Sequence, residues 1–189
     1  RFMYKMKSNF SGKDIFSMHL PSSKAVIYEN SAWFSDAWNA MDFGRDYDFN
    51  KPFFDQLFEL LEKVPLFALS VIYGVNSDYS NNFTAFKNCY LCFNGNYSED
   101  SAYSVGISYA KNCFDCSYVE KSENCYECFW LNFCSNCFYS TQCHNSFNLY
   151  FCKNCVGCND CFGCVDLRNK KHYIFNQAYS KEEYEKFLK

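Results

Sequence analysis

The sequence predicts a mainly β protein whose central part is a right-handed β-solenoid with 12-residue coils. An N-terminal α/β segment and a short C-terminal helix are expected to flank it. Two periodicities and the proline positions predict this fold. All 14 cysteines share one three-residue frame, and columns with a 12-residue period run through the same region. The three prolines all precede that region, so every backbone N–H of the repeat is available for strand pairing.

The three-residue frame is the strongest single signal. The cysteines lie between Cys89 and Cys164, and every gap between neighbouring cysteines is a multiple of three. Chance agreement with one frame has a probability of about one in a million and a half, which favours a structural repeat. No charged, amide or aromatic side chain interrupts the every-third row from Cys89 to Leu167. We therefore expect this row to fill a narrow lumen in which only small side chains fit repeatedly.

The 12-residue period appears when the triplets are grouped by four, beginning at Lys87. Twelve extended residues give a perimeter of about 40 Å, which closes as four short sides with opposite walls roughly 10 Å apart. Asn and Asp tolerate left-handed corners, and stacked Asn amides can hydrogen-bond between coils about 4.8 Å apart. The second position of each block is always one of these two residue types: Asn88, Asp100, Asn112, Asn124, Asn136, Asn148 and Asp160.

The N-terminal part of the sequence shows helix and strand patterns in place of the repeat. Residues 25–28 are predicted to form a strand, and apolar residues at helical spacing predict an amphipathic helix from Lys51 to Lys63, ended by Pro65. An open solenoid end would expose unpaired strand groups. We therefore expect residues 1–86 to form a cap over the first coil.

The C-terminal part is expected to close the other end. Residues 87–167 are assigned to the solenoid and residues 168–189 to a cap made of a strand and a helix. The strand is predicted at 172–176. Ser180 and Glu183 have the spacing of a capping box, which predicts a helix that continues to Lys189.

Composition excludes several classes of protein. Aromatic residues are 22%, hydrophobic residues 49% and charged residues 21%, which excludes global disorder. A net charge of -3 makes a generic nucleic-acid binder improbable. No apolar stretch is long enough to span a membrane, and the N-terminus lacks the pattern of a signal peptide. We expect a cytoplasmic protein with no membrane association.

The thiols allow three interpretations. Cys113, Cys116, Cys125 and Cys128 have the spacing of a zinc or iron–sulfur site. A period of three generates this spacing automatically, however, so it adds little to the repeat itself. Stacked pairs would also be close enough for disulfides. We favour reduced thiols that fill the core, with no cofactor, and keep a zinc or iron–sulfur cluster as the alternative.

The outward positions suggest binding rather than catalysis. Asp115 and Glu127 share a column one coil apart, a spacing compatible with a glycosidase or a calcium site, but we favour two solvated charges because the column holds no other acid. A column of outward aromatic residues would leave a long apolar strip that a protein partner or a second copy is expected to cover. The residues of this predicted interaction face are Tyr126, Phe138, Tyr150 and Phe162.

Four segments carry a resemblance to a known family: 43–49, 76–79, 87–91 and 161–170. They resemble a family of cysteine-rich proteins from candidate-phylum bacteria, and the similarity is chain-wide. Members typically carry zinc ribbons ahead of the region corresponding to this chain, and the family has no assigned activity. The 189 residues contain no such ribbon, so the resemblance implies no catalytic residue and no contact made by the ribbons.

The coil is also similar to that of insect β-helical antifreeze proteins, which have 12 residues per coil and small inward side chains. Their ice-binding face is a row of paired Thr, whereas Thr84 and Thr141 are isolated here, so ice binding is not expected. We predict a non-enzymatic structural or protein-interaction solenoid. A metal–thiolate protein and a carbohydrate-binding or carbohydrate-active solenoid remain the alternatives.

Overall fold

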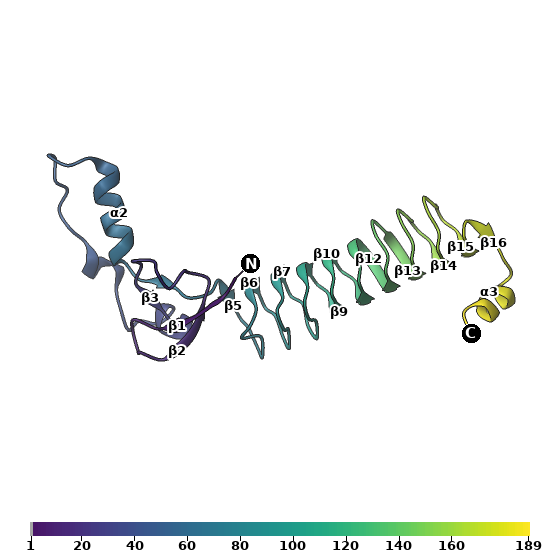
Figure 1. Ribbon diagram of the computed structural model, residues 1–189, viewed down its shortest axis with the longest axis horizontal. Coiled ribbons are helices and arrows are strands. Elements are labelled where there is room, and N and C mark those ends of the chain that lie inside the picture. The colour runs from purple at the N-terminus through teal and green to yellow at the C-terminus, as the bar shows by residue number, and fades with distance from the viewer. Residues whose placement is uncertain (1) are drawn as a thin grey trace. The chain divides into compact units, whose positions relative to one another are not determined.

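The computed structural model describes residues 2–189 and separates into two compact units. The first unit ends at Val71, and the second runs from Ile72 to Lys189. The second unit is a β-solenoid of successive coils that ends in a helix (Figure 1). The predicted fold class is therefore confirmed.

The first unit is built from short elements. A hairpin is followed by a parallel pair of two-residue strands, Ile27 beside Leu66, and Trp33 donates its indole N–H to the Pro65 carbonyl at 2.8 Å. The predicted strand at 25–28 is thus confirmed in its second half. The elements are β1 (Tyr4–Lys7), β2 (Asp14–Ser17), β3 (Ile27–Tyr28), α1 (Asn30–Trp33), the 3-10 helix η1 (Ala40–Phe43), α2 (Phe53–Lys63) and β4 (Leu66–Phe67).

Helix α2 matches the predicted amphipathic helix within two residues. It starts after Pro52, where a missing N–H costs nothing, and Val64 leaves the helical conformation before Pro65. Its apolar side chains are exposed, Phe54 at 66% and Phe58 at 61%. With 11 residues it is the longest helix, and no helix within residues 2–189 has the length and apolar character needed to span a bilayer.

The second unit contains one 12-stranded sheet that winds around the solenoid. The paired strands from β6 to β15 are parallel, and the last pair, β15 with β16, is antiparallel. The strands are β5 (Val71–Ile72), β6 (Asn81–Thr84), β7 (Phe93–Asn96), β8 (Val105–Ser108), β9 (Lys111–Phe114), β10 (Ser117–Glu120), β11 (Glu123–Tyr126), β12 (Phe129–Phe138), β13 (His144–Tyr150), β14 (Asn159–Phe162), β15 (Lys171–Ile174) and β16 (Gln177–Ala178).

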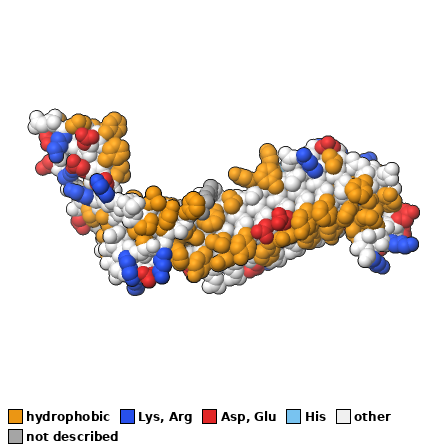
Figure 2. All heavy atoms as spheres, viewed as in Figure 1, with side chains coloured by type: hydrophobic (Ala, Val, Ile, Leu, Met, Phe, Trp, Pro, Cys, Tyr) orange, Lys and Arg blue, Asp and Glu red, His pale blue; other side chains and the backbone are white. Residues whose placement is uncertain are grey.

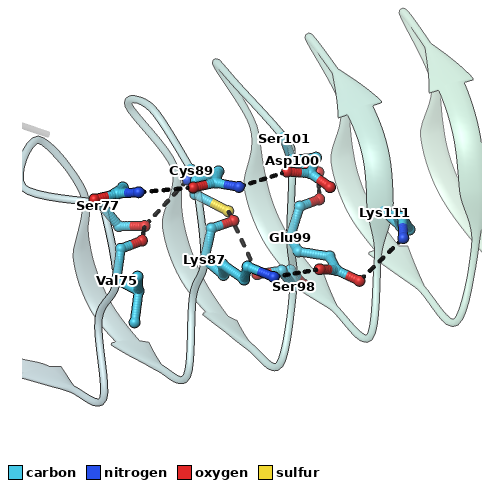
Figure 3. A network of polar contacts seen from close by, with 11 residues as sticks. Val75, Ser77, Lys87, Cys89, Ser98, Glu99, Asp100, Ser101 and Lys111 are labelled. Carbon is cyan, nitrogen blue, oxygen red and sulfur yellow. Dashed lines mark hydrogen bonds and ion pairs between the residues drawn. The ribbon is translucent and has the colours of Figure 1, made fainter.

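Register confirms the 12-residue coil. Cys125 is the partner of Cys113 on one side and of Cys137 on the other, an offset of 12 residues each time. Opposite charges also lie on successive coils: Glu99 lies 3.8 Å from the Lys87 ammonium and 3.2 Å from that of Lys111 (Figure 3). Each coil therefore stacks directly on the one before it.

The Asn and Asp column forms the predicted ladder along the axis. The amide of Asn124 donates to the Asn136 side chain at 3.2 Å, and Asn136 donates to Asn148 at 3.0 Å. Asp160 accepts from Asn148 at 2.8 Å. A carboxylate only accepts, and no donation from Asp100 to Asn112 is formed among the described side chains.

Left-handed backbone is more widespread than the sequence predicted. The residue before each inward position has positive φ from Asn82 to Phe175, which gives four such corners in every 12-residue coil. Trp130 has φ 56° and Phe133 has φ 52°, in a region that bulky residues seldom adopt. The closed four-sided coil imposes this conformation on whatever residue lies at the corner, so it is not restricted to the Asn and Asp column.

The inward row is buried as predicted, and serines connect its coils. Ser101 accepts a hydrogen bond from the Cys113 backbone N–H at 3.1 Å and donates to the Glu99 carbonyl at 2.9 Å. Ser77 and Cys89 form the same contact at 3.1 Å (Figure 3). An inward serine thus supplies an acceptor for an N–H that points into the lumen. The serines that accept in this way are Ser77, Ser80, Ser98, Ser101, Ser104, Ser122, Ser140 and Ser146.

The coils begin before Lys87, the first residue assigned to the solenoid from the sequence. Val75 already bridges to Lys87, and Asn81 pairs with Phe93, both 12 residues apart. Here the inward row contains Phe83 and Phe86, buried rings stacked 4.4 Å apart. The expectation that only small side chains fit repeatedly in the lumen did not identify these two positions as inward. The next inward residue on that side is Gly95, where a Cβ would lie 2.8 Å from the Phe86 ring.

The C-terminal end is closed as predicted by a strand and a helix. Strand β15 adds a further parallel rung on β14, and β16 turns back against it. Helix α3 (Lys181–Phe187) starts at the predicted capping box, in which Ser180 and Glu183 each accept from the other's backbone N–H. Tyr184 is buried against His172, with ring centroids 5.8 Å apart.

Candidate functional site

The lumen thiols are buried side chains with hydrogen-bonded sulfurs. All 14 cysteines are free. The Cys113 Sγ donates to the Lys111 carbonyl at 3.4 Å, and the Cys128 Sγ donates to the Cys137 carbonyl at 3.2 Å. Burial raises the pKa of the Cys158 and Cys164 thiols, and raises that of Cys161 to about 12. These three thiols are therefore protonated donors near neutral pH, whereas thiolates are the nucleophiles and metal ligands.

The predicted metal ligands Cys113, Cys116, Cys125 and Cys128 lie in two neighbouring inward columns, on two successive coils. Within residues 2–189, no group of three or more His, Cys, Asp or Glu side chains has an arrangement that could hold a metal ion. Their sulfurs are directed at backbone carbonyls, including the 3.2 Å contact from Cys116 to Phe114. The structure therefore brings the four residues together as packed core.

Asp115 and Glu127 are vertical neighbours at exposed left-handed corners, with φ 54° and 52°. Neither carboxylate forms an ion pair with a described basic side chain. A glycosidase needs one carboxyl group in a desolvated site that keeps it protonated. Two solvent-exposed corners do not provide that environment.

The outward aromatic residues form two adjacent columns rather than one. The predicted column, with Phe138 and Tyr150, is half-buried. The neighbouring corner column is more exposed, with Tyr139 at 47% and Phe151 at 54%, and Figure 2 shows hydrophobic side chains gathered in rows along the solenoid. We call the aromatic part of these two columns between residues 126 and 162 the aromatic band, which consists of Tyr126, Phe138, Tyr139, Tyr150, Phe151 and Phe162.

Ring geometry in the aromatic band follows the stacking of the coils. Phe138 and Tyr150 lie 5.3 Å apart with planes 5° from parallel, and Tyr139 and Phe151 lie 5.0 Å apart at 3°. Rings stacked in this way cover each other's faces and present their edges to solvent. Tyr126 meets Tyr139 edge to face at 5.5 Å, which joins the two columns.

Helix α3 covers the C-terminal end of the aromatic band. The Phe187 ring packs edge-on against Phe162, with centroids 5.0 Å apart. Phe175 also contacts Phe162, in the space that Gly163 leaves open, since a Cβ on Gly163 would lie 2.7 Å from the Phe175 ring. Phe162 therefore belongs partly to the molecule's own packing, and the exposed part of the band is centred on Tyr139 and Phe151.

Sequence reasoning missed the corner column because Asp115 and Glu127 occupy two of its positions. Its aromatic members are Tyr103, Tyr139, Phe151 and Phe175, and the left-handed corner turns each of them outward. A second stacked pair lies on a different column: Tyr97 and Tyr109, 5.1 Å apart and 56% and 55% exposed. A 12-residue count of all four corner columns would have found both sets.

Comparisons with known proteins assign no function to these surfaces. No protein-family model matches the chain, and a search of curated proteins finds no match. The resemblance to cysteine-rich proteins of candidate-phylum bacteria stays a prediction.

Proposed function

We propose that this protein is a non-enzymatic interaction module whose solenoid associates with a second copy of itself through the aromatic band. The observation that carries this proposal is the stacked corner pair Tyr139 and Phe151, about half exposed on a regular sheet surface. A contiguous apolar surface of this kind commonly marks a contact site. The lumen supplies stability and leaves the outer columns free for recognition.

The period of the band favours a second copy as the occupant. Its rings present edges at the spacing of the coils, about 4.8 Å. An identical band has the same spacing, so ring edges of one copy fit between those of the other over several coils. A two-fold arrangement would use the same patch on both copies, as most homodimers do.

The band offers less to a carbohydrate. A sugar ring stacks on an aromatic face, and the faces of Phe138 and Tyr150 are occupied by each other. The same holds for Tyr139 and Phe151. The exposed carboxylates Asp115 and Glu127 supply no desolvated acid for glycoside chemistry.

A double variant tests the proposal. Tyr139→Glu with Phe151→Glu places two charges in the exposed centre of the band, where corner positions already accept Glu127. The matched control is Tyr97→Glu with Tyr109→Glu, a stacked corner pair of similar exposure in another column. Sedimentation velocity from about 1 to 100 µM is the measurement.

We expect the parent chain and the control to show a concentration-dependent dimer and the band variant to stay monomeric, with equal melting temperatures. A parent chain that stays monomeric throughout overturns self-association. Loss of the dimer in the control as well shows that the band is not the contact site. If the band variant unfolds, the band is core and the proposal fails.

A further inference from the structure

Trp130 lies at a corner outside the aromatic band, where its column changes from large to short side chains. The residue one coil earlier is Tyr118, and the next two coils carry Gln142 and Asn154. Trp130 is 54% exposed, and its only described ring contact is with its neighbour Phe129, edge to face at 6.4 Å. The short side chains that follow leave one side of the indole uncovered.

An open cavity of about 200 Å³ occupies this space. It is lined by Trp130, Gln142, His144 and Asn154. No charged carboxylate, lysine or arginine side chain is part of this lining. The volume is below the range of pockets for drug-sized ligands, which begins at about 300 Å³, and suits a single small ring.

The polar groups of this cavity are largely unused by the protein. Among the described residues, no hydrogen bond is formed by the side-chain amide of Gln142, the His144 ring or the Trp130 indole N–H. Asn154 differs, because it donates to Asp166 at 2.6 Å and accepts from Arg168 at 3.4 Å. Asn154 is thus held in place as a wall, while the other three side chains keep free donors and acceptors.

We propose that Trp130, Gln142 and His144 bind one ring of a neutral carbohydrate. The apolar C–H face of a pyranose stacks on the open indole, which offers a large flat apolar surface. Its hydroxyl groups both donate and accept, and an amide and an imidazole that line the same cavity can match them. This site is independent of the aromatic band and of Asp115 and Glu127, so it adds a ligand to the proposed interaction module.

The test labels the full chain with 5-fluorotryptophan and follows three fluorine resonances, one for each Trp. Trp33 and Trp38 are held by hydrogen bonds of 2.8 and 2.9 Å within the first unit and serve as internal references. Trp130→Phe assigns the third resonance. The probes are cellotriose, maltotriose and mannotriose, with adenosine as the nucleoside and glycerol as the non-specific polyol.

We expect at least one trisaccharide to shift the Trp130 resonance alone, with a saturating curve and a dissociation constant on the order of 1 mM. Gln142→Ala and His144→Ala should each weaken binding about 5- to 10-fold. Asn145→Ala is the matched control, because Asn145 is an exposed amide at a left-handed corner outside the cavity, and it should leave binding unchanged.

Three results would overturn the proposal. The first is no trisaccharide shift beyond that of glycerol up to about 20 mM, and the second is a saturating shift with adenosine alone. The third is binding by the Gln142→Ala and His144→Ala variants that is as tight as binding by the parent chain. The titration of the parent chain decides the first two without any variant. Circular dichroism of each variant checks that its coils are retained.

Discussion

The inner row and the outer columns of the solenoid come from the same triplets but obey different rules. Inward residues such as Ser101 and Cys113 are small, buried and hydrogen-bonded to neighbouring coils. Corner residues of one outward column include Tyr109, Lys121, Phe133 and Gly157, all with positive φ. The difference teaches that closure of the coil restricts side-chain size only on the inside. Side-chain size is therefore restricted mainly at one residue in three, and many of the outward positions are free to encode contacts.

The largest effect should come from moving a large side chain from outside to inside. Cys125→Phe places a ring in a lumen already filled by Cys113 and Cys137 of the adjacent coils. We expect a loss of at least about 3 kcal/mol or failure to fold, because overpacking has no room to relax. Thermal unfolding followed by circular dichroism is the measurement.

Asn145→Phe is the outward counterpart. Phe133 occupies the same column one coil earlier, so a ring there is already compatible with the corner. We expect a loss of no more than about 1 kcal/mol, because the left-handed backbone at this corner, with φ 49°, favours Asn over Phe. Equal destabilisation by both substitutions would contradict the distinction between inner and outer positions.

Alkaline pH should lower the free energy of unfolding through the buried thiols of the inner row. Burial raises the folded-state pKa of Cys158, Cys161 and Cys164 above the unfolded value near 9. Their contribution to stability is complete below pH 9 and is lost as pH rises toward the folded values, about 12 for Cys161. At pH 10 the Cys161 thiol should cost roughly 1 kcal/mol, because it ionises only in the unfolded chain, and Cys158 and Cys164 should shift stability in the same direction.

Urea unfolding at pH 8, 9 and 10 measures this loss. The Cys161→Ser variant removes one titrating thiol and should have a shallower decline than the parent chain. A stability that stays constant from pH 8 to 10 would show that the thiols ionise equally in both states.

A smaller effect should separate ladder corners from other corners. Asn136→Ala removes one hydrogen bond from Asn124 and one to Asn148, while Asn145→Ala removes no described side-chain hydrogen bond. Both positions have left-handed backbone, with φ 52° and 49°, so the conformational cost of Ala is shared. We expect Asn136→Ala to be less stable than Asn145→Ala by about 1 kcal/mol. Equal melting temperatures would show that the ladder adds no stability.

The sequence predicted the solenoid well because its constraints are local and periodic. The inward frame, the Asn and Asp ladder and the Ser180 capping box all follow from spacing alone. It missed the coils before Lys87, because Phe83 and Phe86 depart from the small-residue rule and depend on Gly95 for space.

The surfaces were predicted less completely, for the same physical reason. Outward side chains are not restricted by closure, so spacing does not give their exposure, and packing of α3 against Phe162 depends on contacts distant from the repeat. The cavity beside Trp130 arises where short side chains follow a large one, a feature with no period. The expectation that residues 1–86 cap the first coil stays a prediction.

The central claim is that the inner row is a core of free thiols, and thiol titration with zinc and iron analysis tests it most directly. Native protein should react with a chromogenic disulfide reagent at almost none of its cysteines, because all 14 are buried. Denatured but unreduced protein should give 14 thiols per chain and contain no stoichiometric metal. Fewer than 14 thiols after denaturation would contradict the central claim. So would one zinc or iron bound per chain, if the Cys113→Ser substitution removed both the metal and the fold.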